Sequence, residues 1–252
     1  MEEKRQEKFA VVIDADNSSL NKLDDVLREV STHGRILVKR AYGNWKKDTL
    51  KKWEEAIKRM AIKPQQQFDY VSGKNATDMA LVIDTIELLY SGLYDGFAIV
   101  SSDSDYTPLA IKLRESGVYV LGFGEKKTPE SFRNACDEFI FLENLEEEPE
   151  ETEPEPQEPQ QKGKKPAKPV GDSVQTLHEL LKKAWESCQD EDGFALMSET
   201  GLFLRRIRAD FDPRTYGYKK LGQLLEAFPD HYEIRRYPQK SGGDVLVYRC
   251  LF

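Results

Sequence analysis

The sequence has few of the residues that build disulfide frameworks or zinc sites, and it has no long apolar run. Its three cysteines and three histidines are scattered, without C-x-x-C spacing, which argues for a reducing compartment and against a zinc site. The longest apolar runs are about five residues, whereas a membrane span needs roughly 20. The charged N-terminus leads directly into an apolar segment. We therefore expect a cytoplasmic protein with no signal peptide and no membrane partner.

Common catalytic and nucleotide-binding motifs are missing as well. There is no G-x-S-x-G, and no serine or cysteine has an evident histidine partner. The segment GFGEKK is not G-x-G-x-x-G, and SGKN lacks the glycine five positions before Gly73 that a P-loop requires. These absences argue against serine or cysteine hydrolases and against the common dinucleotide- and nucleotide-binding sites.

The net charge of −8 is concentrated in one segment. Residues 143–172 carry −6, compared with −2 for residues 1–142 and zero for residues 173–252. This segment is rich in Glu, Pro and Gln, and it has too few apolar side chains to offset the entropy cost of ordering. We predict a disordered linker over 143–172 between one domain over 1–142 and another over 173–252. Because both domains are nearly balanced in charge, the overall acidity does not exclude an RNA partner.

Strand-like and helical segments alternate before the linker. The expected strands are FAVVI, RILVKRAYG, FDYV, FAIV and VYVLGFG, each followed by a helical pattern, and TPESFRNACDEF closes the series as a helix. This alternation predicts an α/β domain whose parallel sheet carries helices on both faces. After the linker, three helical segments and a strand pair within about 80 residues predict a small winged helix-turn-helix domain.

Aspartates stand where these elements would bring them to one end of the sheet. Asp14 ends the first strand, Asp103 and Asp105 follow FAIV, and Asp78 lies in the first turn of the helix after FDYV. Each acid alone could be a helix cap or turn former. Together they would repel one another, and a hard cation is the usual resolution. We therefore predict that these four aspartates bind Mg²⁺ or Mn²⁺ and are catalytic.

Basic and aromatic residues accompany the expected site. Such groups suit a phosphate backbone and stacked bases, and the RNA-contacting candidates are Arg40, Tyr42, Trp45, Lys126 and Lys127. Asp84 is six residues beyond Asp78, about 120° around the helix, so a hydrogen bond on the helix face is expected for it instead.

The motifs FAVVIDADN, GKNATDMALVIDTIELLYSGLYDGFAIVSSDSDYTPLAIKLRESG and VLGFGEKKTPESFRNACDEF resemble the NYN-domain family of PIN-like nucleases. The resemblance covers nearly all of residues 8–142. It implies a Rossmann-like PIN-type fold and Mg²⁺- or Mn²⁺-dependent ribonuclease chemistry. The family's acidic positions fall on Asp14, Asp78 and Asp103, with Asp105 as the fourth. Asp78 stands where many PIN domains carry a glutamate.

The second half, FALMSETGLFLRRIRADFDPRTYGYKKLGQLLEAFPDHYEIRR, resembles an OST-HTH (LOTUS) domain. The resemblance implies a winged-helix module that binds RNA or docks onto protein partners. The RNA-contacting candidates here are Arg205, Arg206, Arg208, Lys219 and Lys220, with Tyr216 and Tyr218 able to stack on bases.

These observations predict a metal-dependent ribonuclease tethered to an RNA-binding module. Hydrolysis would proceed by in-line attack on phosphorus and leave a 5′-phosphate and a 3′-hydroxyl. Asn17 and Ser102 would orient metal-bound waters, and Lys74 would hold a phosphate. Two alternatives stay open: a non-catalytic RNA-binding adaptor, and a phosphatase or DNA nuclease that uses the same acidic site.

Overall fold

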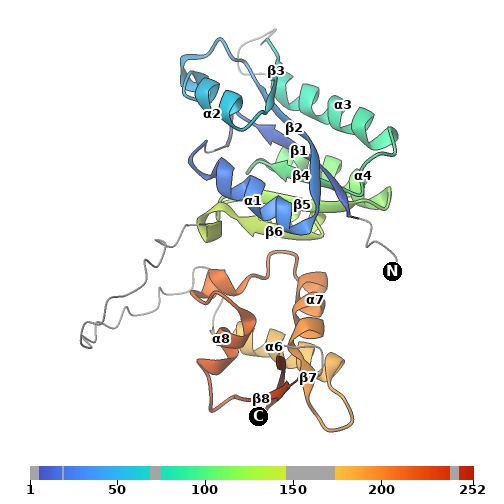
Figure 1. Ribbon diagram of the computed structural model, residues 1–252, viewed down its shortest axis with the longest axis vertical. Helices are drawn as coiled ribbons and strands as arrows, with labels where there is room; N and C mark the ends of the chain where they lie inside the picture. Colours follow the sequence, from blue (N-terminus) through green and yellow to red (C-terminus); the bar gives the residue numbers. More distant parts are fainter. Residues whose placement is uncertain (1–5, 19, 69–74, 146–173, 239–243) are drawn as a thin grey trace, which may run out of the picture. The chain divides into compact units, whose positions relative to one another are not determined.

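The computed structural model describes residues 6–18, 20–68, 75–145, 174–238 and 244–252 (Figure 1). The chain forms two compact units, Met1–Glu148 and Pro149–Phe252. Residues 143–145 of the expected linker belong to a short 3-10 helix, η4 (Leu142–Leu145), whose Leu142 and Leu145 are buried in the first unit's core. The first unit therefore extends three residues beyond the expected boundary at 142. The rest of the expected linker, and its boundary at 172, lie outside the described residues.

The first unit is built on a six-stranded sheet in which every neighbouring pair is parallel. The strand order is β3-β2-β1-β4-β5-β6. The strands are β1 (Lys8–Asp14), β2 (Arg35–Gly43), β3 (Lys63–Gln66), β4 (Gly96–Val100), β5 (Tyr119–Gly124) and β6 (Glu138–Phe141). This arrangement confirms the predicted α/β class.

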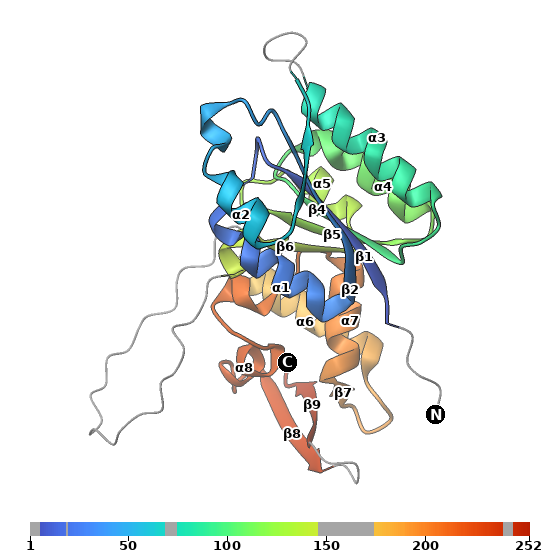
Figure 2. The same ribbon diagram turned by 45° about the horizontal axis from the view of Figure 1, so that its top comes forward.

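Helices cover both faces of the sheet (Figure 2). One face carries α1 (Leu23–His33) and α2 (Trp53–Arg59), and the other carries α3 (Ala76–Tyr90), α4 (Thr107–Glu115) and α5 (Glu130–Ala135). The side chains of β1 alternate between two cores: Phe9, Val11 and Ile13 pack with α1 and α2, while Ala10 and Val12 pack with α3 and α4. Burial on both faces explains why FAVVI is continuously apolar. Short 3-10 helices complete the unit at η1 (Leu20–Lys22), η2 (Asp48–Leu50) and η3 (Ser104–Tyr106).

Two strands differ from the sequence prediction. The third strand is KPQQ at β3, not FDYV, of which residues 69–71 lie outside the described residues. Because β3 is an edge strand that pairs only with β2, it can be polar and can contain Pro64. EFIF, expected at the end of the closing helix, forms β6, and all four of its side chains are buried. Glu138 is tolerated there because its carboxylate accepts a hydrogen bond from the Tyr119 hydroxyl at 3.0 Å and contacts His33 Nε2 at 3.2 Å.

The strand order places a switch point between β1 and β4. The chain runs outward from β1 through β2 to β3 and then returns to lay β4 on the other side of β1. Loops that leave adjacent strands in opposite directions open a crevice at their carboxyl ends, where open α/β sheets bind ligands. The loops after β1 and β4 therefore flank the expected binding position.

The second unit is a small helical domain with an antiparallel sheet. Its elements are α6 (Val174–Cys188), β7 (Ala195–Leu196), α7 (Met197–Ile207), η5 (Pro213–Tyr216), α8 (Leu221–Glu226), β8 (Tyr232–Pro238) and β9 (Asp244–Cys250). The sheet order is β7-β9-β8. Leu181, Leu204, Leu225 and Tyr248 are fully buried at its core. The three expected helices and the strand pair are confirmed, and β7 adds a strand that was not expected. Across the described ranges, no helix is both long and apolar enough to cross a bilayer.

Candidate active site

Asp14 is the buried centre of the candidate site. It ends β1 with no exposed surface, and its carboxylate accepts hydrogen bonds from the Asn17 side-chain amide at 3.0 Å and from the Ser101 hydroxyl at 3.0 Å. The Asn17 backbone N–H adds a further hydrogen bond at 3.2 Å. Burial raises the pKa of Asp14 to about 6; the hydrogen bonds from Asn17 and Ser101 oppose this rise, and the charge of Asp78 adds to it. The sequence predicted that Asn17 orients a metal-bound water, and its contact with Asp14 places its side chain at the site.

Asp103 and Asp105 lie on the loop after β4. The Asp103 backbone N–H donates to Ser101 Oγ at 3.1 Å, and the Asp105 backbone N–H donates to Asp103 Oδ1 at 2.9 Å. Asp105 Oδ2 accepts from the Asn75 side-chain amide at 2.9 Å, just before α3. Ser101 thus joins the β4 loop to Asp14, and Asn75 joins the same loop to the start of α3.

Asp78 completes the predicted set from the first turn of α3. Its Oδ1 accepts a hydrogen bond of 2.8 Å from the hydroxyl of Tyr106, a residue with no exposed surface. The pKa of Asp78 is raised, first by burial and then by the charges of Asp103, Asp105 and Asp16, while the Tyr106 hydrogen bond lowers it. The four predicted aspartates therefore do lie at one end of the sheet.

Asp16 is a fifth acid at this end. Its Oδ2 accepts from the Thr77 hydroxyl at 3.1 Å, and its Oδ1 lies 3.4 Å from Lys47 Nζ. Its position two residues after Asp14 gave the signal, but sequence reasoning did not include it among the metal ligands. Among the described residues, Asp16 is the one acid of this group that forms an ion pair.

The acidic set fits a hard divalent cation. Asp14 and Asp78 each have a pKa raised in part by neighbouring carboxylates, and a bound cation would relieve that repulsion. Within the ranges that the structure describes, no group of three His, Cys, Asp or Glu side chains is already gathered closely enough to hold a metal ion. Mg²⁺-like binding, in which one or two carboxylates bind directly and waters complete the shell, does not require such a group.

Ser102 and Lys74 are the two other residues predicted to position metal-bound water or phosphate. The Ser102 hydroxyl oxygen accepts the Glu125 backbone N–H at 2.9 Å, so this serine fastens the β4 loop to the β5 loop. Ser101, which sequence reasoning missed, instead contacts Asp14. Lys74 lies outside the described residues.

The side chains of Arg40 and Tyr42, two of the predicted RNA contacts, form hydrogen bonds within the first unit. Both donate hydrogen bonds to Asp84 on α3, which also accepts from the Gln65 side-chain amide at 3.3 Å. The helix-face hydrogen bond expected for Asp84 is therefore confirmed. Because the Tyr42 side chain is 1% exposed, the prediction that it stacks on a base is wrong. The side chain of Arg40 is 20% exposed and ion-paired with Asp84.

Other candidate RNA contacts of the first unit lie on loops. Trp45 is half-buried and donates its indole N–H to the Gln65 carbonyl at 3.0 Å. Lys126 and Lys127 are exposed after β5, and Lys127 pairs with Glu125 at 2.7 Å. RNA contact by these residues stays a prediction.

The candidates of the second unit lie at the end of α7, within η5, and between η5 and α8. Arg205 and Arg206 are exposed in the last turn of α7, and Lys219 and Lys220 are exposed directly before α8. Arg208 pairs with Asp210 at 2.9 Å. Tyr216 and Tyr218 are half-buried and pack against the unit's core, so each ring has only part of its surface open to a base.

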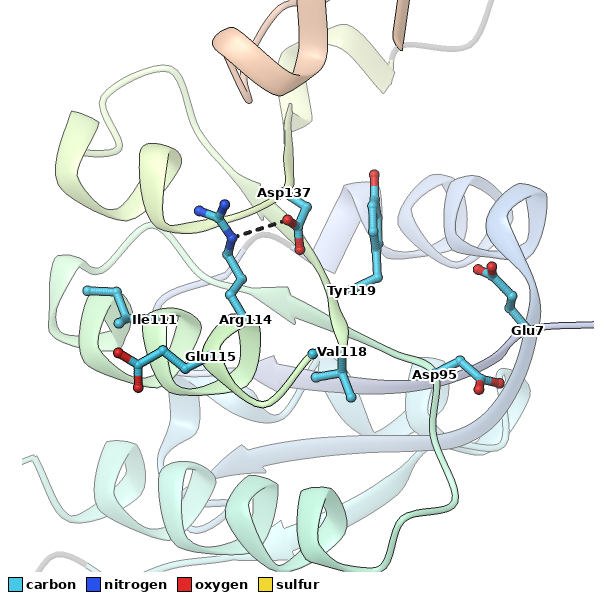
Figure 3. A pocket seen from close by; sticks show the side chains of 9 residues that line it. Glu7, Asp95, Ile111, Arg114, Glu115, Val118, Tyr119 and Asp137 are labelled. Atoms are coloured by element: carbon cyan, nitrogen blue, oxygen red, sulfur yellow. Dashed lines mark ion pairs between the residues drawn. The ribbon is translucent and has the colours of Figure 1, made fainter. Parts of the chain in front are cut away.

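A shallow cavity of about 670 Å³ opens at the other end of the first unit's sheet, where the strands begin (Figure 3). Its polar lining is largely matched internally: Arg114 Nε lies 3.1 Å from Asp137 Oδ1, and Asp95 accepts the Lys8 backbone N–H at 2.9 Å. It contains none of the five site acids. The carboxyl ends of the strands, not this cavity, carry the candidate chemistry.

Residues 8–143 match the NYN domain family, and residues 172–243 match the OST-HTH/LOTUS domain family. The chain therefore belongs to the NYN domain family and carries a C-terminal OST-HTH/LOTUS domain. NYN domains are typically metal-dependent nucleases, and OST-HTH/LOTUS domains bind RNA.

Comparison with solved structures gives more distant likenesses. A protein of unknown function from Vibrio parahaemolyticus is 16% identical over 56% of this chain and 96% of its own, with a TM-score of 0.46. An uncharacterized protein from Nitrosomonas europaea is 28% identical over 42% of this chain and 92% of its own, with a TM-score of 0.27. At these scores neither likeness carries an argument. No curated protein matches the chain.

Proposed function

We propose that the protein is a ribonuclease that depends on Mg²⁺ or Mn²⁺ and hydrolyses RNA phosphodiesters at the carboxyl ends of β1 and β4. One observation carries this proposal: acids from three separate elements meet at the switch point of the sheet, where the charge of Asp78 raises the pKa of Asp14 and the charge of Asp103 raises the pKa of Asp78. Repulsion of this kind destabilises a fold, so its presence points to a ligand of opposite charge. The family match supports the same chemistry.

When bound, the divalent cation would polarise the phosphoryl group and supply a nucleophilic water. Asp14, Asp78 and Asp103 would hold it, one or two of them directly and the others through bound waters, and Asp105 would complete the acidic set. Asn17 and Ser101 hold the Asp14 carboxylate in one orientation through bonds of 3.0 Å each. The buried position of Asp14 also keeps bulk water away from one side of the site.

The OST-HTH/LOTUS unit would bind the same RNA molecule. Its exposed Arg205, Arg206, Lys219 and Lys220 can contact phosphates. Because the two units share one chain, binding by one raises the local concentration of RNA at the other. Weak binding by each unit would then suffice for efficient capture. Cytoplasmic location and contact with protein partners through this unit are parts of the same proposal.

The direct test is cleavage of 5′-labelled single-stranded and structured RNA in Mg²⁺, Mn²⁺ or EDTA by wild type and Asp103→Asn. Asparagine can still accept the Asp105 N–H that Asp103 Oδ1 accepts now, so the loop should stay folded. The matched control is Asp48→Asn, whose side chain is 88% exposed and lies outside the acidic set.

The expected result is metal-dependent cleavage that EDTA and Asp103→Asn abolish and Asp48→Asn preserves. The products should carry a 5′-phosphate and a 3′-hydroxyl. RNA binding without cleavage in either metal would reject the nuclease proposal and identify an adaptor. Faster cleavage of DNA than of RNA, or release of phosphate from monoesters, would reject the substrate class.

A further inference from the structure

The segment that follows β2, together with the end of β3 and the two residues after it, forms a hydrogen-bonded ridge beside the candidate active site. The ridge consists of residues 44–47 and 65–68. The Trp45 backbone N–H donates to Gln66 Oε1 at 3.0 Å, and its indole N–H donates to the Gln65 carbonyl at 3.0 Å. The Gln66 side-chain amide donates to Asn44 Oδ1 at 3.1 Å. Three cross-links of this kind fix the two segments relative to each other.

Phe68 is the exposed aromatic side chain of the ridge. Its side chain is 51% exposed, and the Lys46 ammonium lies 5.0 Å from its ring centroid. A single exposed apolar side chain is common on protein surfaces and needs no explanation by itself. An exposed ring with an ammonium on it, however, is the pairing with which proteins bind single-stranded nucleic acids: the ring stacks on a base and the cation contacts phosphate.

The position of the ridge relates it to the acids. β3 is separated from β1 by β2, so the end of β3 lies two strand spacings, about 10 Å, from the end of β1 at Asp14. Lys47 on the ridge lies 3.4 Å from Asp16, and Asp16 accepts a hydrogen bond from Thr77 at the start of α3. The ridge therefore contacts the acidic end of the sheet through Lys47 and Asp16.

We propose that Phe68 and Lys46 form a subsite for one unpaired nucleotide of the RNA whose phosphodiester lies at the acids. The base stacks on the Phe68 ring, and Lys46 contacts the adjoining phosphate. Because every base has a stacking face, the subsite selects unpaired over paired nucleotides and does not read sequence. This inference rests on the proposed function, because it names the substrate as single-stranded RNA.

The test is a double-mutant cycle between protein and RNA with the full chain. The variants are Phe68→Ala, which removes the ring, and Phe68→Trp, which keeps a stacking face. The RNAs are single-stranded oligonucleotides with one abasic nucleotide moved along the chain. Tyr90→Ala is the matched control: this aromatic side chain is 74% exposed but ends α3, about 22 Å along that helix from its start near the acids.

The expected result for Phe68→Ala is a KM at least about five-fold higher on intact RNA, with Phe68→Trp and Tyr90→Ala near wild type. One abasic position should raise the KM of the wild type by a similar factor and leave that of Phe68→Ala unchanged, because the lost contact is the same. An unchanged KM for Phe68→Ala, or equal abasic losses in both proteins, would overturn the subsite.

Fluorescence anisotropy in EDTA repeats the cycle on binding alone. This measurement separates the two proposals, because it tests the subsite whether or not the protein cleaves RNA. Coupling between Phe68 and one nucleotide in EDTA supports the subsite, and its absence there overturns it. Failure of the wild type to cleave in either metal rejects the nuclease proposal alone.

Discussion

The hydroxyl of Tyr106 donates to Asp78 Oδ1 at 2.8 Å and so links the β4 loop to the first turn of α3. Tyr106 has no exposed surface, and it stands three residues after Asp103 on η3. A second buried tyrosine, Tyr42, makes the corresponding bond to Asp84 lower on the same helix. Two tyrosine hydroxyls thus bind α3, one at Asp78 in its first turn and one at Asp84 farther along. Of these two acids, only Asp78 belongs to the candidate site.

Removing the Tyr106 hydroxyl should weaken metal binding. Tyr106→Phe keeps the buried ring and frees the Asp78 carboxylate to rotate, so the Mn²⁺ concentration for half-saturation should rise about ten-fold or more. Tyr42→Phe should leave it unchanged, although each variant should lose about 1 kcal/mol of stability. Isothermal titration with Mn²⁺ and urea unfolding of the full chain measure the two effects. Equal Mn²⁺ affinities for the two variants would show that Tyr106 acts only on stability.

The buried Asp14 should make the metal-free protein less stable as the pH rises. Its pKa is raised from 3.8 to about 6, so its contribution to stability is fully present below about pH 4 and is lost as the pH rises through 6. In EDTA, Asp14→Asn should therefore gain roughly 2–3 kcal/mol over the wild type between pH 4 and pH 7. Urea unfolding across this range measures the difference. If the difference in stability between Asp14→Asn and the wild type does not change with pH, the raised pKa assigned to the buried Asp14 carboxylate is wrong.

The second unit should bind RNA mainly through charge. Replacing both Lys219 and Lys220 by Gln should lower RNA affinity and reduce the slope of log affinity against log salt by roughly 1.4, because each phosphate contact on a single strand contributes about 0.7. Replacing Lys182 and Lys183 on α6 by Gln removes the same charge from another element of that unit and should change the slope less. Anisotropy titrations at several salt concentrations provide the slopes. Identical slopes for the two double variants would place the RNA elsewhere.

The site was predictable to the extent that backbone direction determined it. In a parallel sheet every strand points its carboxyl end the same way, so an acid after FAVVI and two after FAIV had to share an edge. Asp78 followed from the same reasoning, since the helix after β3 starts at that edge. Continuous apolar runs identified β1, β4 and β5 because both faces of the central strands are buried.

The features that the sequence did not predict depend on the direction of individual side chains and on strands at the edges of the sheet. Ser101 and Ser102 are adjacent and chemically identical, and only the first points at Asp14 while the second turns to Glu125. Tyr42 lies at a strand end, where a sequence does not show whether the ring faces solvent or the helix above it. The polar β3 carried no apolar pattern because one of its sides is unpaired. The strand β6 was not predicted because it contains the acidic Glu138. The partners that allow this residue to be buried, His33 and Tyr119, are remote in sequence.

The hydroxyl of Ser101 has a consequence for how activity first appears in a growing chain. Asp14, Asn17 and Asp78 emerge from the ribosome early, but Ser101, Asp103 and Asp105 follow β4 in the sequence. Until β4 inserts beside β1, Asp14 lacks its serine donor and the two acids of the β4 loop. A nascent chain that ends before residue 101 therefore lacks the serine donor and both acids of the β4 loop. The segment translated first therefore lacks part of the candidate site. The activity proposed for this protein can begin only after β4 has paired with β1.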